Sequence, residues 1–211
     1  MKFLNFKRVL CLAPHPDDAE YSIAGAVLKY PETHFDILCL TQGGFCDITP
    51  GKARHQEVRD AWSVSKVTNY NLYFSDEPVL RNKGIDEWVK YIEDTFTLQN
   101  EYNCLLVPSE VDSHHEHVVV SSLAAPLSRV TPYSILQYRS PSTLDGWIPN
   151  LFISLSDSQY RIKKEMIKGF KSQKGKPYFL DNVVDGFHTN FQGLKKGKGF
   201  VESYRIVTYY E

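Results

Sequence analysis

Short apolar runs alternate with longer amphipathic segments along most of the chain. The apolar runs are rich in β-branched and aromatic residues, which is typical of buried strands. They lie at residues 8–13, 34–41, 70–74, 102–107, 134–138, 151–156 and 203–210. Between them, apolar residues recur at helical spacing and predict helices over residues 19–30, 52–66, 85–98, 117–130 and 157–173.

This alternation predicts an α/β fold with a Rossmann-like, mostly parallel sheet and helices on both faces. A chain of 211 residues, of which 42% are hydrophobic, is long enough to bury a sizeable core. No repeat or boundary interrupts it, so we expect a single domain over residues 1–211. The stretch 174–199 is rich in Gly and Lys and too long for a simple connector, so it is either a functional loop or a mobile one.

Polar clusters follow two of the predicted strands. APHPDDAE, residues 13–20, comes after the first run, and DSHHEH, residues 112–117, comes after the fourth. In open α/β sheets, ligands bind beyond the carboxyl ends of the strands. His114 and His117 are three residues apart, so at a helix start they share one face while His115 points away. The two clusters together predict one functional site.

Zinc suits the side chains of these clusters. A catalytic zinc site keeps three protein ligands and one open position. His15, Asp18 and His117 would supply such a set, for one Zn²⁺ or another divalent ion per chain. Asp17 would remain beside a water whose pKa the metal lowers to about 7, and would act as general base. The alternatives are that Asp17 or Asp18 caps the following helix and that the His-rich stretch is a solvated helix start.

Composition gives no sign of a nucleic-acid or membrane partner, although a local basic surface remains possible. Lys and Arg number 24 against 25 Asp and Glu, so no basic excess points to nucleic acid. Charges and prolines interrupt the basic N-terminus too soon for a signal peptide or membrane span, and we expect a cytoplasmic protein. Cys11, Cys39 and Cys104 lie in apolar runs and Cys46 in a polar loop, without CxxC spacing. This predicts free thiols in a reducing compartment, dispensable for catalysis.

HPDD after an apolar strand, followed later by HxxH, resembles the PIG-L/LmbE-like zinc N-deacetylases, which deacetylate N-acetylglucosamine-type substrates. The resemblance covers most of the chain. Its weaker matches are TQGG at residues 41–44 for a Thr-x-Gly-Glu loop, Arg54-x-x-Glu57 on a helix, Asp76 after the third strand, residues 151–173 for a strand and a Lys-rich helix ending in Ser-Gln, and Glu202-Ser-Tyr204 for a closing Glu-x-Phe.

The resemblance implies distinct roles for the residues of the two clusters. Its zinc ligands correspond to His15, Asp18 and His117, and its base to Asp17. It implies that His114 stabilises the oxyanion and protonates the departing amine.

Two further residues are implied to hold sugar hydroxyls, namely Arg54 and Asp76. From the residues alone, Arg54 is equally a solvated helix charge paired with Glu57, and Asp76 is equally a turn cap.

The chain also departs from the family pattern. Its second motif has Glu116 where the family usually has Asp in His-Pro-Asp-His, so this acid is one methylene longer. We expect Glu116 or Asp112 to hold His114 in its protonated form, because a neighbouring carboxylate raises the pKa of a histidine. Gly44 replaces the acid of the second-strand loop.

These observations predict a hydrolase that removes the acetyl group from an N-acetylated amino sugar, whether a free GlcNAc-type sugar, a sugar nucleotide or a glycoconjugate. The alternatives are another metal-dependent amidase, acting on a thiol conjugate, or a phosphoester hydrolase, which often needs two metals. A nucleotide-binding module would require a GxGxxG turn after the first strand, where this chain has HPDD. The sequence leaves the exact substrate and the oligomeric state open.

Several other residues are candidates for the site. His188, in the stretch 174–199, either reaches the site from a lid or is an exposed loop histidine. Aromatic side chains that could stack on sugar rings are Tyr133, Tyr138, Trp147 and Tyr178.

Overall fold

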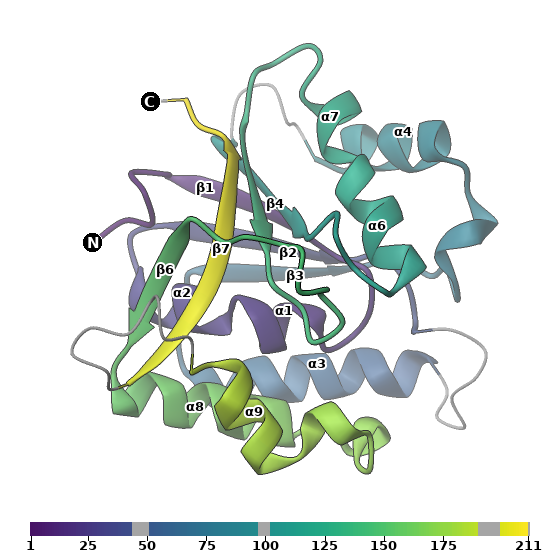
Figure 1. The fold of residues 1–211 in the computed structure, drawn as a ribbon. Coiled ribbons are helices and arrows are strands. Elements are labelled where there is room, and N and C mark those ends of the chain that lie inside the picture. The colour runs from purple at the N-terminus through teal and green to yellow at the C-terminus, as the bar shows by residue number, and fades with distance from the viewer. Residues whose placement is uncertain (44–50, 97–101, 190–198, 211) are drawn as a thin grey trace.

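The centre of the molecule is a seven-stranded sheet of strand order β3-β2-β1-β4-β5-β7-β6 (Figure 1). The computed structural model describes residues 1–43, 51–96, 102–189 and 199–210. Its strands are β1 (Arg8–Ala13), β2 (His34–Cys39), β3 (Tyr70–Phe74), β4 (Cys104–Pro108), β5 (Ser134–Tyr138), β6 (Leu151–Leu155) and β7 (Phe200–Thr208). In this spatial order, the neighbouring strands from β3 through β2, β1 and β4 to β5 pair in parallel, and β7 pairs antiparallel with both β5 and β6. The predicted α/β fold with a mostly parallel sheet is confirmed.

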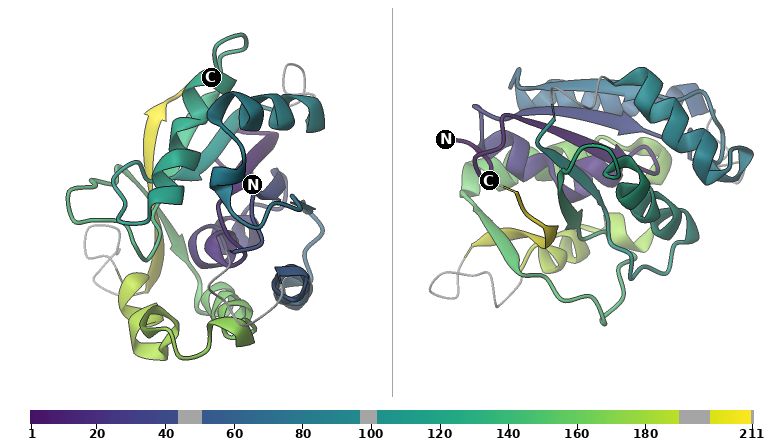
Figure 2. Two further views of the ribbon diagram at one scale, coloured as in Figure 1. Left: turned by 90° about the vertical axis from the view of Figure 1, so that its right-hand side faces the viewer. Right: turned by 90° about the horizontal axis from the view of Figure 1, so that it is seen from above.

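Helices cover both faces of the sheet, as predicted (Figures 1 and 2). The α-helices are α1 (Asp18–Ser22), α2 (Ala24–Lys29), α3 (Gly51–Ser65), α4 (Ile85–Thr95), α6 (His115–Ser122), α7 (Ala124–Leu127), α8 (Asp157–Lys168) and α9 (Asp181–Phe187). Short 3-10 turns are η1 (Leu80–Asn82), η2 (Lys171–Gln173) and η3 (Pro177–Phe179). Helices α1, α2, α3 and α8 lie on one face, and α4, α6 and α7 on the other.

Strand β1 shows why the sheet buries both faces. Val9 and Cys11 join the core beneath α3 and α8, while Leu10 and Leu12 join the core beneath α4 and α6. Successive residues of a strand point to opposite faces, so a strand buried on both sides is apolar throughout. The continuous run RVLCLA therefore specifies a central strand with a polar loop at its carboxyl end.

The helix predicted over residues 19–30 is broken in two at Ile23, which lies outside helical geometry at φ −125° and ψ −6°. The Glu202 carboxylate, buried on β7, accepts hydrogen bonds from the backbone N–H of Gly25 at 2.6 Å and of Ala26 at 2.8 Å. A Cβ on Gly25 would lie 2.7 Å from this carboxylate. The acid thus caps α2 from a distant strand, and glycine leaves the room that it needs.

Other predicted boundaries shift for local reasons. The helix predicted over 117–130 begins at His115 and is interrupted at Leu123, while 157–173 ends as α8 at Lys168 followed by η2. The stretch 174–199 contains η3 and α9, so its described part is ordered secondary structure rather than only loop. Glu57 binds the backbone N–H of Ser172, which fastens α3 to η2, so it is not paired with Arg54.

Three of the four cysteines, Cys11, Cys39 and Cys104, are buried free thiols. Burial raises the pKa of each well above its usual range. Cys46 and Gly44 lie outside the described residues. Within the described part of the chain, no helix is long and apolar enough to cross a membrane.

Candidate active site

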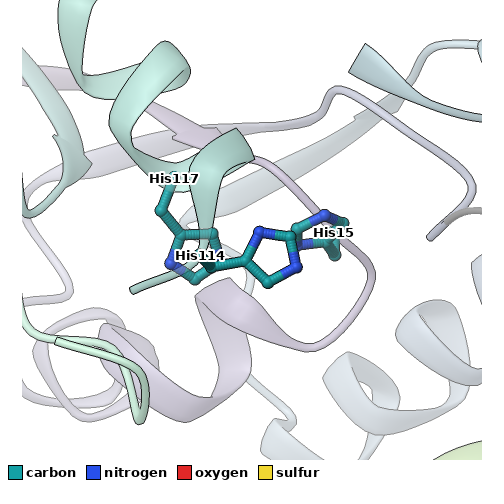
Figure 3. A group of neighbouring side chains, drawn as sticks. All are labelled: His15, His114 and His117. Atoms are coloured by element: carbon teal, nitrogen blue, oxygen red, sulfur yellow. The ribbon is translucent and has the colours of Figure 1, made fainter. Parts of the chain in front are cut away.

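The two predicted clusters meet because β1 and β4 are adjacent parallel strands, so the loops after them lie side by side. The first loop carries His15 and Asp18, and the second, with the start of α6, carries His114 and His117. Figure 3 shows the three histidines converging from these two segments. Their ring centroids are 4.5 Å apart for His15 and His114 and 4.9 Å apart for His114 and His117.

Asp18 joins the partly buried His15 to the buried His117. Its Oδ2 atom lies 3.1 Å from Nδ1 of His15, and its Oδ1 atom lies 3.3 Å from Nε2 of His117. Oδ2 also accepts the backbone N–H of His15 at 2.8 Å. Asp17, at the position before α1, makes no side-chain cap hydrogen bond, so the helix-cap alternative does not describe this pair.

The outer nitrogen of each of these imidazoles faces a second carboxylate. Nε2 of His15 lies 2.6 Å from Glu116, and Nδ1 of His117 lies 3.1 Å from Asp112. Glu116 in turn accepts the backbone N–H of Leu80 at 2.7 Å. Metal-binding histidines characteristically donate the ring N–H that does not face the metal to a carboxylate, which fixes tautomer and orientation.

A serine-rich loop after β5 completes the arrangement around Asp112. The Ser140 hydroxyl donates to Oδ2 of Asp112 at 2.6 Å, and the Thr143 hydroxyl does so at 3.2 Å. Ser142 Oγ lies 3.4 Å from Nδ1 of His117. Burial by itself raises the pKa of Asp112, but His117 and the hydroxyls of Ser140 and Ser142 lower it to about 2. Asp112 is therefore an ionised acceptor for His117.

The donor set fits a divalent metal ion. His15 Nδ1, His117 Nε2 and the two oxygens of Asp18 face one another, while Glu116 and Asp112 hold the opposite edges of the rings. One nitrogen from each of His15, His114 and His117 also lies within 4.8 Å of the others, so a three-histidine group could hold a metal. The predicted ligands are thus brought together, and Asp18 and His114 are rival third ligands.

Protonation competes with metal at this position. Burial by itself lowers the pKa of both imidazoles, but Asp18 and Glu116 raise the pKa of His15 to about 9. Asp18 and Asp112 likewise raise the pKa of His117 to about 10. A metal must replace these protons, because it binds neutral imidazole.

Asp17 lies beside Asp18 in a strained backbone conformation, with φ 127°. Burial and then the charge of Asp18 raise its pKa to about 7, a value suited to a general base. Arg54, predicted to hold sugar hydroxyls, is 3% exposed, and its guanidinium lies 3.6 Å from Asp17. It also donates to the carbonyls of Pro16 at 2.9 Å and Gly43 at 3.0 Å. Arg54 positions the HPDD loop and is not a solvated helix charge.

His114 departs from expectation in its electrostatics. Neither Glu116 nor Asp112 holds its ring: Asp112 accepts only its backbone N–H, at 2.8 Å, and the two acids instead hold His15 and His117. Partial desolvation, then the charges of His15 and His117, lower the pKa of His114. The expected contact of Glu116 or Asp112 with the His114 ring is therefore not made, because the two carboxylates hold His15 and His117 instead.

A cavity of about 390 Å³ opens over this cluster. Its lining comprises His15, Asp17, Asp18, Tyr21, Gly43, Arg54, His114, Glu116, His117, Pro141, Ser142, Lys176, Tyr178 and Phe179. Asp76 is exposed and is not among these described lining residues. Of the aromatic candidates only Tyr178 reaches the cavity, since Tyr133, Tyr138 and Trp147 are buried in the fold.

His188 is neither a lid residue nor an exposed one. It is fully buried at the end of α9, with Nδ1 2.8 Å from the Val184 carbonyl and Nε2 3.2 Å from the Tyr21 carbonyl. Burial and the charge of Lys163 hold its pKa well below the usual range.

Sequence reasoning missed Ser140 and Lys176. Ser140 carries no motif, although it follows a strand as the recognised clusters do, and Lys176 is one of many lysines in the stretch 174–199.

The geometry defines the class of protein: an α/β fold with a His–Asp cluster suited to a metal at the carboxyl edge of its sheet. A sequence model of the GlcNAc-PI de-N-acetylase (PIG-L) family matches residues 10–127, and the chain belongs to this family. It is thus a hydrolytic N-deacetylase.

Two similar proteins are described as deacetylases, and a third of the same fold is a hydratase. An Escherichia coli K12 protein described as the uncharacterized deacetylase YaiS is 24% identical over 179 residues, 79% of this chain and 91% of that protein. The N,N'-diacetylchitobiose deacetylase of Pyrococcus horikoshii superposes with a TM-score of 0.73 at 19% identity, covering 97% of this chain and 85% of that one. GalB of Pseudomonas putida KT2440, a 4-carboxy-2-hydroxymuconate hydratase, superposes with a TM-score of 0.72 at 14% identity over 97% of this chain and 98% of its own. Likeness in fold alone therefore does not name the reaction.

Proposed function

We propose that the protein removes the acetyl group from an N-acetylated amino sugar, with one Zn²⁺ held by His15, Asp18 and His117. The observation that carries the proposal is the placement of Asp18, whose two oxygens face the two imidazoles, with Asp17 next to it in the cavity. When bound, the metal supplies Lewis-acid chemistry that polarises the acetamide carbonyl and lowers the pKa of water.

Asp17 is the proton carrier of the proposed reaction. Its carboxylate takes a proton from the attacking water and, once protonated, passes it to the nitrogen that leaves as a free amine. Arg54, 3.6 Å away, holds the ionised form in place, and burial keeps its pKa high enough to accept a proton near neutral pH. The products are acetate and the amino sugar.

His114 supplies a hydrogen bond rather than a proton in this scheme. Its lowered pKa leaves it neutral, and a neutral imidazole still has one N–H to donate to the oxygen that becomes negatively charged in the transition state. This modifies the role that the family resemblance implies, in which His114 protonates the amine. Asp18 is preferred to His114 as the third ligand because it already contacts both other ligands.

The cavity supports a substrate of sugar size. Its volume, about 390 Å³, falls in the range of about 300–1,000 Å³ of small-molecule sites. The lining offers the aromatic ring of Tyr178 and the hydroxyl of Ser142, groups that suit a sugar ring and its hydroxyls. Asp76 lies outside this described lining, so the sugar contacts are assigned to the cavity wall instead.

A phosphoester hydrolase is the less supported alternative, because two-metal phosphoesterases need a second set of ligands. Among the residues that the structure describes, His15, His114 and His117 form one cluster able to hold a metal.

The test combines metal analysis with product analysis. Purified protein should contain one zinc per chain and release acetate and free amine in equal amounts from at least one member of a panel of N-acetylated sugars. Chelation should abolish this release, and added Zn²⁺ should restore it. Absence of metal that added zinc cannot correct, or cleavage of p-nitrophenyl phosphate without acetate release from any sugar, would overturn the proposal.

A further inference from the structure

The cavity has two sides of different origin. The polar cluster, including His15 and His117, lies within residues 10–127, which match the family. The facing wall, Lys176 and Tyr178 with their neighbours, comes from residues beyond that match. Lys176 and Tyr178 thus come from a different part of the chain than His15 and His117, and this wall is where we look for the protein's own specificity.

The wall is built into the fold. The Tyr21 hydroxyl, from α1, donates to the Tyr178 carbonyl at 2.7 Å. The Tyr21 ring meets Tyr178 and Phe179 edge-on, with centroids 6.5 Å and 6.0 Å away. Tyr21 is 2% exposed and joins Ile167 of α8 and Val184 of α9 in one apolar cluster. The backbone of η3 is therefore fixed relative to the catalytic loop, which places Tyr178 in a defined position.

Two cations line the described cavity, and they differ in surroundings. Arg54 is buried and binds two backbone carbonyls beside Asp17, so it belongs to the HPDD loop. Lys176 is half-buried on the facing wall, where its ammonium lies 5.9 Å from the centroid of the Tyr178 ring. Lys176 and Asp17 line the same cavity. Lys176 thus places a cation next to an aromatic face within electrostatic reach of the reacting end.

We propose that Lys176 and Tyr178 form a subsite for an anionic substituent of the sugar, a phosphate or a carboxylate, with the sugar ring against Tyr178. This inference rests on the proposed function, which fixes the acetamide at the Asp17 end and turns the rest of the substrate toward the wall. An ammonium is a compact donor that binds phosphate or carboxylate by a charge-assisted hydrogen bond. The preferred substrate is then an acidic N-acetylated sugar rather than a neutral one.

The test compares N-acetylated sugars with and without an anionic substituent. Metal-loaded protein is assayed for acetate release from N-acetylglucosamine, from N-acetylglucosamine 1-phosphate and from N-acetylmuramic acid, which carries a carboxylate. Lys176→Gln removes the charge, Lys176→Arg keeps it, and Lys174→Gln is the matched control, since Lys174 is exposed and not in the described cavity lining.

We expect kcat/KM to be about tenfold higher for the preferred acidic sugar than for N-acetylglucosamine, the scale of one charge-assisted hydrogen bond. Lys176→Gln should remove this preference, so that acidic and neutral sugars react at similar rates, Lys176→Arg should retain most of it, and Lys174→Gln should change nothing. The acidic sugar with the larger increase in kcat/KM shows whether the subsite prefers phosphate or carboxylate.

Equal rates on acidic and neutral sugars, or equal losses from Lys176→Gln and Lys174→Gln, overturn the subsite while the deacetylase stands. If no sugar is deacetylated, the proposed function falls, and calorimetry then decides the subsite. Glucosamine 1-phosphate should bind about tenfold more tightly than glucosamine, through Lys176 alone; without that difference, the subsite falls too.

Discussion

Nε2 of His15 lies 2.6 Å from the carboxylate of Glu116, although the two residues are 101 positions apart in the chain. Glu116 also accepts the backbone N–H of Leu80, so its carboxylate is held from two sides. The acid that departs from the family's usual Asp therefore orients a predicted metal ligand, and its extra methylene serves a contact with the first loop.

This contact predicts that Glu116 sets metal affinity. Glu116→Ala should weaken zinc binding by about 10- to 100-fold, because the outer-shell partner of a ligand histidine is lost. Glu116→Gln should weaken it less, since a hydrogen bond to His15 remains possible without the charge. Competition against a chelator measures both, with Glu93→Ala on the exposed face of α4 as control. Unchanged affinity in Glu116→Ala would show that His15 needs no partner.

Asp17→Asn should leave zinc content normal and lower kcat by about 10²- to 10⁴-fold, the usual cost of a lost general base. Asn is the informative substitution because Asp17 has φ 127°, and Asn tolerates positive φ far better than Ala does. Elemental analysis and acetate release are the measurements. Loss of zinc along with activity would make Asp17 a ligand.

The hydrophobic patterns sufficed to predict the fold class, because most strands and helices have a local pattern of apolar residues. RVLCLA is apolar on both faces, which is typical of a central strand. The break at Ile23 could not be predicted, because the carboxylate that caps Gly25 belongs to Glu202, 177 residues away. Such long-range contacts leave no period in the sequence.

The candidate site shows the same division. His15, Asp18 and His117 were predictable as a group because both clusters follow strands that a parallel sheet places side by side. The partners of Glu116 and Asp112 were not predictable. The sequence predicts that they hold the ring of His114, whereas they hold His15 and His117. Pairing between loops depends on side-chain geometry that spacing does not encode.

Asp36 gives a pH-dependent prediction away from the site. Its fully buried carboxylate accepts hydrogen bonds from Arg8 at 2.6 Å, Tyr102 at 2.8 Å and Asn71 at 2.9 Å. Burial by itself raises the pKa of Asp36, but these donors bring it below its usual value. A carboxyl whose folded pKa is depressed stabilises the fold above its unfolded pKa, and this stability is lost as pH falls through the folded value.

Asp36→Asn should therefore lower the free energy of unfolding at neutral pH by about 1–3 kcal/mol, the cost of disrupting a buried hydrogen-bonded charge. The difference from wild type should shrink as pH falls below about 4, where the unfolded carboxyl is protonated. Urea unfolding across this range is the measurement, with the exposed Asp60→Asn as control. A difference that is constant with pH would mean that packing, not charge, is responsible.

Asp18 and His114 are the two candidates for the third metal ligand. Variants of the two residues distinguish a metal ligand from a residue that contacts the acetamide. Asp18 faces both His15 and His117, whereas the His114 ring stacks on His117 at 4.9 Å and is exposed to the cavity. We expect Asp18→Ala and His117→Ala to lose zinc, because each removes a ligand and leaves a buried imidazole or carboxylate without its partner. His114→Ala should keep zinc and lose rate by roughly 10²-fold or more, because a donor to the developing negative charge is gone. Zinc titration with a competing chelator, together with rates for each metal-loaded variant, decides which residue is the third ligand.

Loss of zinc in His114→Ala with retention in Asp18→Ala would make the three histidines the ligand set and leave Asp18 as their hydrogen-bond partner.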